Sequence, residues 1–186
     1  MSDPTARPPL SLPAMVRLLA DHGVDWVLTG STVLALHGAD LVPADLDVTP
    51  ATDQDNLDRL AGALVAAGAV PAYTPGWRED FTLDTCRAWR PEPATEERLE
   101  YLYVTRHGML DVPFRLCGEY GELARGAETV DVAGVPVEVC ALSEVLDRVT
   151  ALTSPKHLAR AGVYAGLRDR AGSAREGVGR LLDRLR

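Results

Sequence analysis

The stretch VDWVLTGSTVLALHGADLVPADLDVTP, residues 24–50, sets the organisation of the whole chain. Its first apolar run predicts a short strand, and Gly30-Ser31 then opens a predicted helix. Residues 44–50 predict a second strand, which carries Asp45 and Asp47 one residue apart. Two neighbouring carboxylates in an otherwise apolar strand repel each other and lose stability on burial. We therefore expect this stretch to hold a functional site.

The spacing of the two aspartates places them on the same face of the strand. Side chains at i and i+2 project together, so Asp45 and Asp47 point one way while Leu46 and Val48 point the other. A divalent cation would relieve the repulsion between the carboxylates. Their hard oxygen atoms suit Mg²⁺, which typically takes one or two carboxylates together with substrate phosphates.

Gly30-Ser31 predicts an anion site beside these carboxylates. The start of a helix presents free backbone N–H groups and the positive end of the helix dipole. Glycine lets a phosphate approach the backbone, and the Ser31 hydroxyl can donate a hydrogen bond to it. The same hydroxyl could equally cap its own helix, and the two uses are compatible. Metal-binding carboxylates next to an anion site indicate a site for a nucleoside triphosphate.

A third carboxylate is expected from a later strand. Asp111 lies between Leu110 and Val112, and it could complete a two-metal site or accept a proton from an attacking hydroxyl. Asp84 and Asp131 also have apolar-Asp contexts and are its rivals.

Composition limits the class of protein. The chain has 186 residues, 46% of them hydrophobic, and a net charge of −8. This acidic balance argues against a general binder of nucleic acid or membrane surfaces. Three scattered cysteines without a C-x-x-C pair predict reduced thiols in a cytoplasmic protein. Residues 1–11 lack the apolar core of a signal peptide and predict a flexible leader.

The remaining pattern predicts an α+β fold with a short mixed β-sheet flanked by helices and a C-terminal helical segment. Further strands are expected near residues 80–85, at 99–105 and 109–116, and in a hairpin turning at Ala133-Gly134. The predicted helices cover residues 12–23, 31–38, 52–68, 119–127, 143–152, 154–170 and the basic amphipathic tail from 176.

The order Gly-Ser, thirteen intervening residues, Asp-apolar-Asp-apolar and a later apolar-Asp-apolar resembles the polymerase-beta-type nucleotidyltransferase superfamily. Within it, the chain resembles the small bacterial nucleotidyltransferases that include abortive-infection (AbiEii-like) toxins. The likeness extends to the order of the later strands, the hairpin and a lysine-bearing helix. It implies a nucleotidyltransferase core at residues 12–140, with the helical segment 141–186 packed on it.

The resemblance also implies an activity: transfer of a nucleoside monophosphate from a nucleoside triphosphate such as ATP to a hydroxyl, with release of pyrophosphate. Asp45 and Asp47 would hold Mg²⁺ or Mn²⁺, and Asp111 would be the third ligand or the general base. Gly30, Ser31 and Lys156 would bind the phosphates. The chain departs from the family at "SPKH", where Ser154 and His157 replace the arginine and the acid of an Arg-Pro-Lys-Asp type element.

The acceptor is left open between a small hydroxyl compound, tRNA and a protein, and a toxin would have an antitoxin partner. A degenerate member that binds nucleotide or a partner without catalysis is the alternative from a different class. Trp77 could stack on a base, although a loop tryptophan more often covers a small core. Tyr101 and Tyr103 share a strand face and predict cross-strand packing.

Overall fold

The strand that carries Asp45 and Asp47 lies at the centre of a mixed sheet. A computed structural model of the chain describes residues 2–77, 81–168 and 173–186, and for Lys156 it describes the backbone alone. In this part of the chain the sheet has seven strands in the order β3-β4-β5-β2-β1-β7-β6. The strands are β1 (Trp26–Thr29), β2 (Asp45–Pro50), β3 (Val70–Pro71), β4 (Leu102–Thr105), β5 (Gly108–Asp111), β6 (Glu128–Val132) and β7 (Val135–Val139).

The predicted mixed sheet is confirmed, but the prediction that it would be short is wrong. β2 pairs parallel with β5, β1 pairs parallel with β7, and the other pairings are antiparallel. The two-residue strand β3 and the hairpin β6–β7 lengthen the sheet at its two edges. The hairpin turns where predicted, at Ala133 and Gly134, which both have positive φ.

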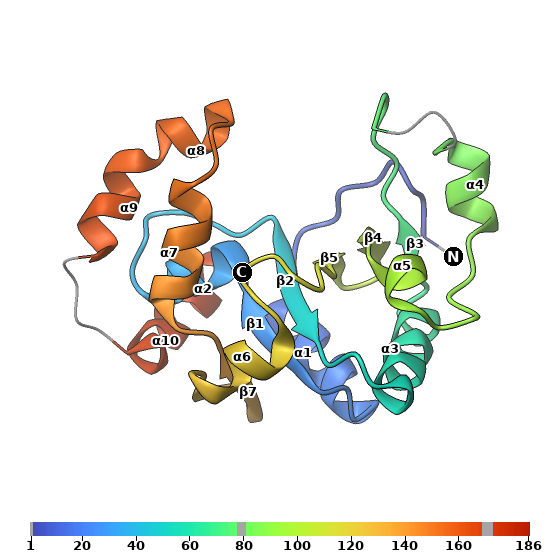
Figure 1. The fold of residues 1–186 in the computed structure, drawn as a ribbon, viewed down its shortest axis with the longest axis horizontal. Coiled ribbons are helices and arrows are strands. Elements are labelled where there is room, and N and C mark those ends of the chain that lie inside the picture. Colours follow the sequence, from blue (N-terminus) through green and yellow to red (C-terminus); the bar gives the residue numbers. More distant parts are fainter. Residues whose placement is uncertain (1, 78–80, 169–172) are drawn as a thin grey trace.

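Helices cover the two ends of the sheet and one of its faces. Figure 1 shows α7, α8 and α9 together at one end of the molecule and α3, α4 and α5 at the other, with β2 and β5 between them. The helices are α1 (Leu12–Asp21), α2 (Gly30–Leu36), α3 (Gln54–Ala66), α4 (Leu83–Ala88), α5 (Glu96–Leu99), α6 (Tyr120–Arg125), α7 (Leu142–Thr150), α8 (Pro155–Ala159), α9 (Ala161–Arg168) and α10 (Val178–Arg184), with a 3₁₀ turn η1 (Ala174–Gly177) before the last.

The side chains that alternate with the aspartates form the core. Leu46 and Val48 have no solvent exposure, and they belong to the main apolar cluster together with residues of α1 and α3. This burial fixes the register of β2, because a shift by one residue would move the aspartates into the core. The face of the sheet that carries the carboxylates is therefore set by the hydrophobic effect.

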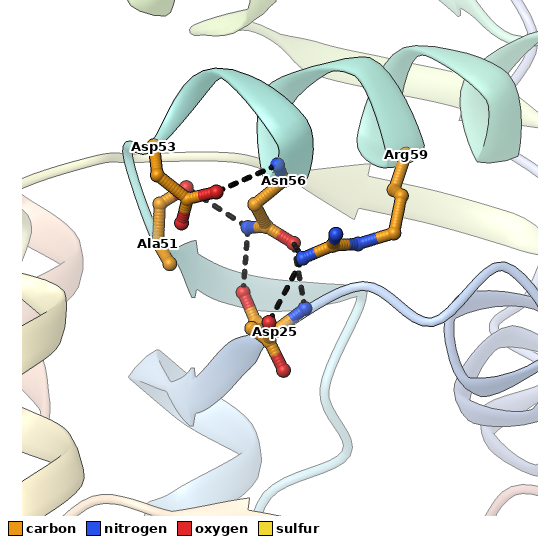
Figure 2. Close-up of polar contacts among 5 residues, drawn as sticks. All are labelled: Asp25, Ala51, Asp53, Asn56 and Arg59. Atoms are coloured by element: carbon orange, nitrogen blue, oxygen red, sulfur yellow. Dashed lines mark hydrogen bonds and ion pairs between the residues drawn. The ribbon is translucent and has the colours of Figure 1, made fainter.

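A buried asparagine connects α3 to the ends of the two central strands (Figure 2). The Asn56 amide group donates to the backbone oxygens of Asp25 and Ala51, each at 2.9 Å, and its oxygen accepts from the Asp25 N–H at 2.8 Å. The Arg59 guanidinium also donates to this oxygen, at 3.1 Å. Asp53 caps the helix by accepting from the Asn56 N–H. Every polar atom of this fully buried side chain is thus bonded, as burial requires.

Several local predictions differ from the structure. The strand expected near residues 80–85 is α4, because Thr82 and Thr85 form a reciprocal capping box that begins a helix. Asp80 in that range lies outside the described residues. The strands expected at 99–105 and 109–116 are shorter: residues 96–99 form α5, and β5 ends at Asp111, before Pro113. The predicted helix 154–170 is divided into α8 and α9, and residues 169–170 lie outside the described part.

Residues of the predicted leader contact the edge of the sheet. Ser2 bonds to the Gly68 oxygen, the Tyr73 N–H donates to Pro4, and the Ser11 N–H donates to His107. Leu10 is buried. In the described part of the chain, no helix combines the length and apolar character needed to cross a membrane.

Candidate active site

Strand register brings the three predicted aspartates onto one face of the sheet. Asp47 lies directly opposite Asp111 in the parallel pair β2–β5, and Asp45 lies two residues before Asp47. Directly paired residues project to the same face, as do residues two apart. Asp47 is buried, and Asp45 and Asp111 are half-buried. Their predicted roles as metal ligands and base stay predictions.

Gly30 and Ser31 contact one of these carboxylates. The Ser31 N–H donates to Oδ2 of Asp47 at 3.2 Å. The helix begins at Gly30, one residue earlier than predicted, and the side chain of its N-cap residue, Thr29, makes no capping hydrogen bond. The carboxylate from β2 thus takes the place of the hydroxyl cap expected from Ser31.

Only glycine fits at the junction between β1 and α2. Gly30 has φ +65°, and a Cβ atom added to it would lie 2.0 Å from Asp47 Oδ2. Both the backbone conformation and the close approach of the carboxylate therefore exclude other side chains. The Gly-Ser pair and the aspartate strand are two parts of a single packed unit.

The carboxylates form one wall of a cavity of about 190 Å³. The C-terminal helices form another wall, which includes Arg148 of α7, His157 of α8, and Arg160 at the end of α8. The His157 Nδ1 lies 3.0 Å from the hydroxyl of the buried Tyr164, which fixes the position of the ring. Cys117 and several aliphatic side chains complete the lining.

Sequence reasoning did not find Arg148 and Arg160. Each is an ordinary arginine in an amphipathic helix, and no motif distinguishes it from a solvated one. Neither guanidinium forms an ion pair with a described residue, whereas Arg59, Arg115, Arg168 and Arg184 each pair with a nearby carboxylate. The cavity therefore has an acidic wall on the sheet and a basic wall on the helices.

Asp111 has an unusual electrostatic environment. The pKa of its carboxyl group is raised from the ordinary 3.8 to about 6, mainly by burial and also by the negative charges of Asp45 and Glu100, while a hydrogen bond from the Val112 N–H acts in the opposite direction. A carboxyl group with a pKa near 6 can exchange protons close to neutral pH.

The donor chemistry of the site suits a hard divalent cation. Three carboxylates share one face, and the charge of Asp45 acts on Asp111. As the side chains stand, however, the described residues contain no group of three or more His, Cys, Asp or Glu side chains close enough to form a ready metal site. One reason is that the Asp47 carboxylate is directed to the Ser31 N–H.

The other predicted residues lie elsewhere or are only partly described. The backbone of Lys156 lies in the first turn of α8, next to the cavity residue His157, and its side chain lies outside the described part of the structure. The rivals of Asp111 lie away from the cavity. Asp84 is on α4 with a side chain that is 97% exposed, and Asp131 is on the outer strand β6, where it accepts from the Gly134 N–H.

Comparison with known proteins gives structural matches only. No protein-family model matches the chain, and no curated protein matches it. A solution structure of the antibiotic-resistance factor ANT(2'')-Ia overlaps 92% of this chain and 89% of its own, with a TM-score of 0.49 and 13% identity. A crystal structure of ANT(2'')-Ia in complex with adenylyl-2''-tobramycin overlaps 92% of each chain, with a TM-score of 0.48 and 14% identity. With TM-scores below 0.5, neither similarity assigns a function to this chain.

Proposed function

We propose that this chain is a metal-dependent nucleotidyltransferase. It transfers a nucleoside monophosphate from a nucleoside triphosphate to a hydroxyl acceptor and releases pyrophosphate. The observation that carries the proposal is the cavity with two walls of opposite charge: three aspartates on β2 and β5 face a helical wall with two arginines. A divalent cation suits the first wall, and a triphosphate bound to that cation suits the second.

The proposed roles follow the two walls. Asp45 and Asp47 would hold Mg²⁺ or Mn²⁺, and the bound cation would neutralise charge on the phosphates and on the leaving pyrophosphate. Arg148 and Arg160 would bind phosphate oxygens, as guanidinium groups do well. Gly30 and Ser31 would approach the phosphates where α2 begins, once the Asp47 carboxylate releases the Ser31 N–H.

The size of the cavity limits what lies inside it. About 190 Å³ is smaller than the roughly 300–1,000 Å³ of typical ligand sites. The cavity therefore suits the phosphates and the cation, and the sugar and base would extend beyond it. Lys156, in the same helix as His157, is proposed as a further phosphate ligand.

Asp111 is proposed as the general base. It accepts the proton of the acceptor hydroxyl, the oxygen forms a bond to the α-phosphorus, and the bond from that phosphorus to the bridging oxygen breaks as pyrophosphate leaves. A pKa near 6 leaves Asp111 deprotonated at neutral pH and basic enough to accept the proton. Alignment of the hydroxyl with the α-phosphorus and electrostatic stabilisation of the phosphoryl charge together supply most of the rate enhancement in such a reaction.

Transfer of label tests the proposal. The purified protein is incubated with each α-labelled triphosphate, Mg²⁺ and a cell extract, and both the labelled product and pyrophosphate are measured. Asp47→Asn should abolish transfer while circular dichroism shows an intact fold. Asp84→Asn, the same substitution at an exposed site, should transfer at the parental rate. Parental activity in Asp47→Asn would refute the mechanism.

A further inference from the structure

A second cavity lies next to the first, and Asp111 lines both. It has a volume of about 320 Å³, and it is bordered by Thr74 and Trp77 from the loop after β3, by Glu100 and Tyr101 before β4, and by Asp111 at the end of β5. The carboxylate that we propose as the base therefore stands between the charged cavity and this one. A compound in the second cavity would have its hydroxyl groups beside Asp111.

Aromatic side chains are concentrated beside this second cavity. Five of the ten aromatic residues of the chain form one connected group: Trp77, Phe81, Trp89, Tyr101 and Tyr103. The ring of Phe81 stacks on that of Tyr101 with 5.6 Å between the ring centroids, and Trp77 packs edge-on against Phe81 with 4.8 Å between their centroids. Trp77 is nevertheless 51% exposed. An indole that is held by two other rings and open to solvent offers a rigid surface on which a ring can stack.

The charge of the second cavity is opposite to that of the helical wall. Glu100 and Asp111 carry its charge, and none of its described lining residues is basic. Glu100 is exposed and lies close enough to raise the pKa of Asp111. A phosphate-rich acceptor would be repelled here, whereas a protonated amine would be attracted both to the carboxylates and to the face of the indole.

We propose that the second cavity is the acceptor site, and that the acceptor is a small ring compound bearing both a hydroxyl and a protonated amine. The inference rests on the proposed transfer reaction and names its substrate class. Trp77 stacks on the ring, Glu100 pairs with the amine, and the hydroxyl lies at Asp111. Nucleic acid is disfavoured as the acceptor, because its backbone would bring negative charge to an acidic cavity.

Calorimetric binding with three matched sugars tests the class of acceptor. The probes are the β-1,4-linked disaccharide of glucosamine, its N-acetylated form, which has no positive charge, and a sulfated disaccharide. The amino sugar should bind at least about tenfold more tightly than the acetylated one, and the sulfated one should not bind. Glu100→Gln and Trp77→Ala should each weaken binding of the amino sugar at least about fivefold. Glu97→Gln, the same charge change at an exposed position of α5, should leave it unchanged.

Binding of a triphosphate in the presence of Mg²⁺ is measured on the same proteins. Triphosphate binding that Glu100→Gln does not alter, together with selective binding of the amino sugar, would support the assignment. Equal binding of the three sugars, or no binding of the amino sugar by a protein that binds triphosphate, would overturn it and leave the proposed transfer reaction standing. A protein that binds the amino sugar but no triphosphate would instead contradict the proposed function.

Discussion

Replacing Asp111 by asparagine should stabilise the protein in the absence of metal. The pKa of this carboxyl group rises from 3.8 to about 6 in the folded state, mainly because the group is buried. At about 1.36 kcal/mol for each tenfold change in proton affinity, the cost of ionising Asp111 in the folded protein reaches roughly 3 kcal/mol. Since the carboxylate borders two open cavities, solvent screening reduces this figure to about 1–2 kcal/mol.

The sign of the pH dependence follows from the raised pKa. Between pH 3.8 and about 6 the folded state holds the proton more tightly than the unfolded state, so folding stability falls as the pH rises through this window. The full cost is present at pH 8, and most of it is lost at pH 4, where the folded carboxyl group is protonated and the unfolded one is about half ionised. Asp111→Asn removes the ionisable group, so its advantage over the parent should be complete at pH 8 and fall to about a fifth of that value at pH 4.

Thermal unfolding followed by circular dichroism, in EDTA, measures the difference. A gain of about 1–2 kcal/mol corresponds to roughly 2–8 °C in Tm for a chain of this size. Asp84→Asn, at an exposed site, should stay within about 0.5 kcal/mol of the parent at both pH values. Lower stability of Asp111→Asn than of the parent at pH 8, or the same difference at pH 4 and pH 8, would refute the electrostatic reasoning.

Three further substitutions test the packing of the site and the basic wall. Gly30→Ala should lose at least about 2 kcal/mol of unfolding free energy in urea, because the added Cβ would collide with the Asp47 carboxylate. Gly76→Ala, which has a similar φ and open space around it, should lose only about 1 kcal/mol. Equal losses in the two variants would contradict the predicted clash at Gly30. Asn56→Ala should lose about 2–4 kcal/mol by the same assay, because the backbone oxygens of Asp25 and Ala51, which flank β1 and β2, lose their donors. A loss below about 1 kcal/mol would exclude this role. Arg148→Gln should weaken triphosphate binding, measured by equilibrium dialysis, about tenfold. Arg17→Gln removes a guanidinium that donates to the Ala133 oxygen in the β6–β7 hairpin, and it should leave triphosphate binding unchanged. Equal effects of the two substitutions would contradict a role for Arg148 in phosphate binding.

The centre of the fold could be predicted from the sequence because local signals and burial agree there. The alternation of Asp45 and Asp47 with Leu46 and Val48 predicts both the strand and the face of it that carries the carboxylates. Asp111 could be placed in a later strand by the same pattern. Its exact pairing with Asp47 could not be predicted, because strand order and register depend on contacts between segments about sixty residues apart in the chain.

The rest of the site depends on tertiary contacts that cannot be predicted from the local sequence pattern. Arg148 and Arg160 become part of the cavity only because α7 packs against α2, beside the carboxylates, and α8 and α9 follow it. The sequence near residues 80–85 resembles a strand, but Thr82 and Thr85 form a reciprocal capping box that begins a helix instead. Trp77 packs against Phe81 and Tyr101, as a loop tryptophan that covers a small core does, and about half of it remains exposed beside the second cavity.

The central claim is that the carboxylate wall holds a divalent cation together with a triphosphate. Electron paramagnetic resonance of Mn²⁺, titrated with the protein and a non-hydrolysable triphosphate, measures this directly. The account predicts that the protein and the triphosphate together bind Mn²⁺ more tightly than either alone. It also predicts that Asp45→Asn and Asp47→Asn abolish the gain while Asp84→Asn retains it. Mn²⁺ binding that the triphosphate does not strengthen, or that survives the loss of both central carboxylates, would contradict the account.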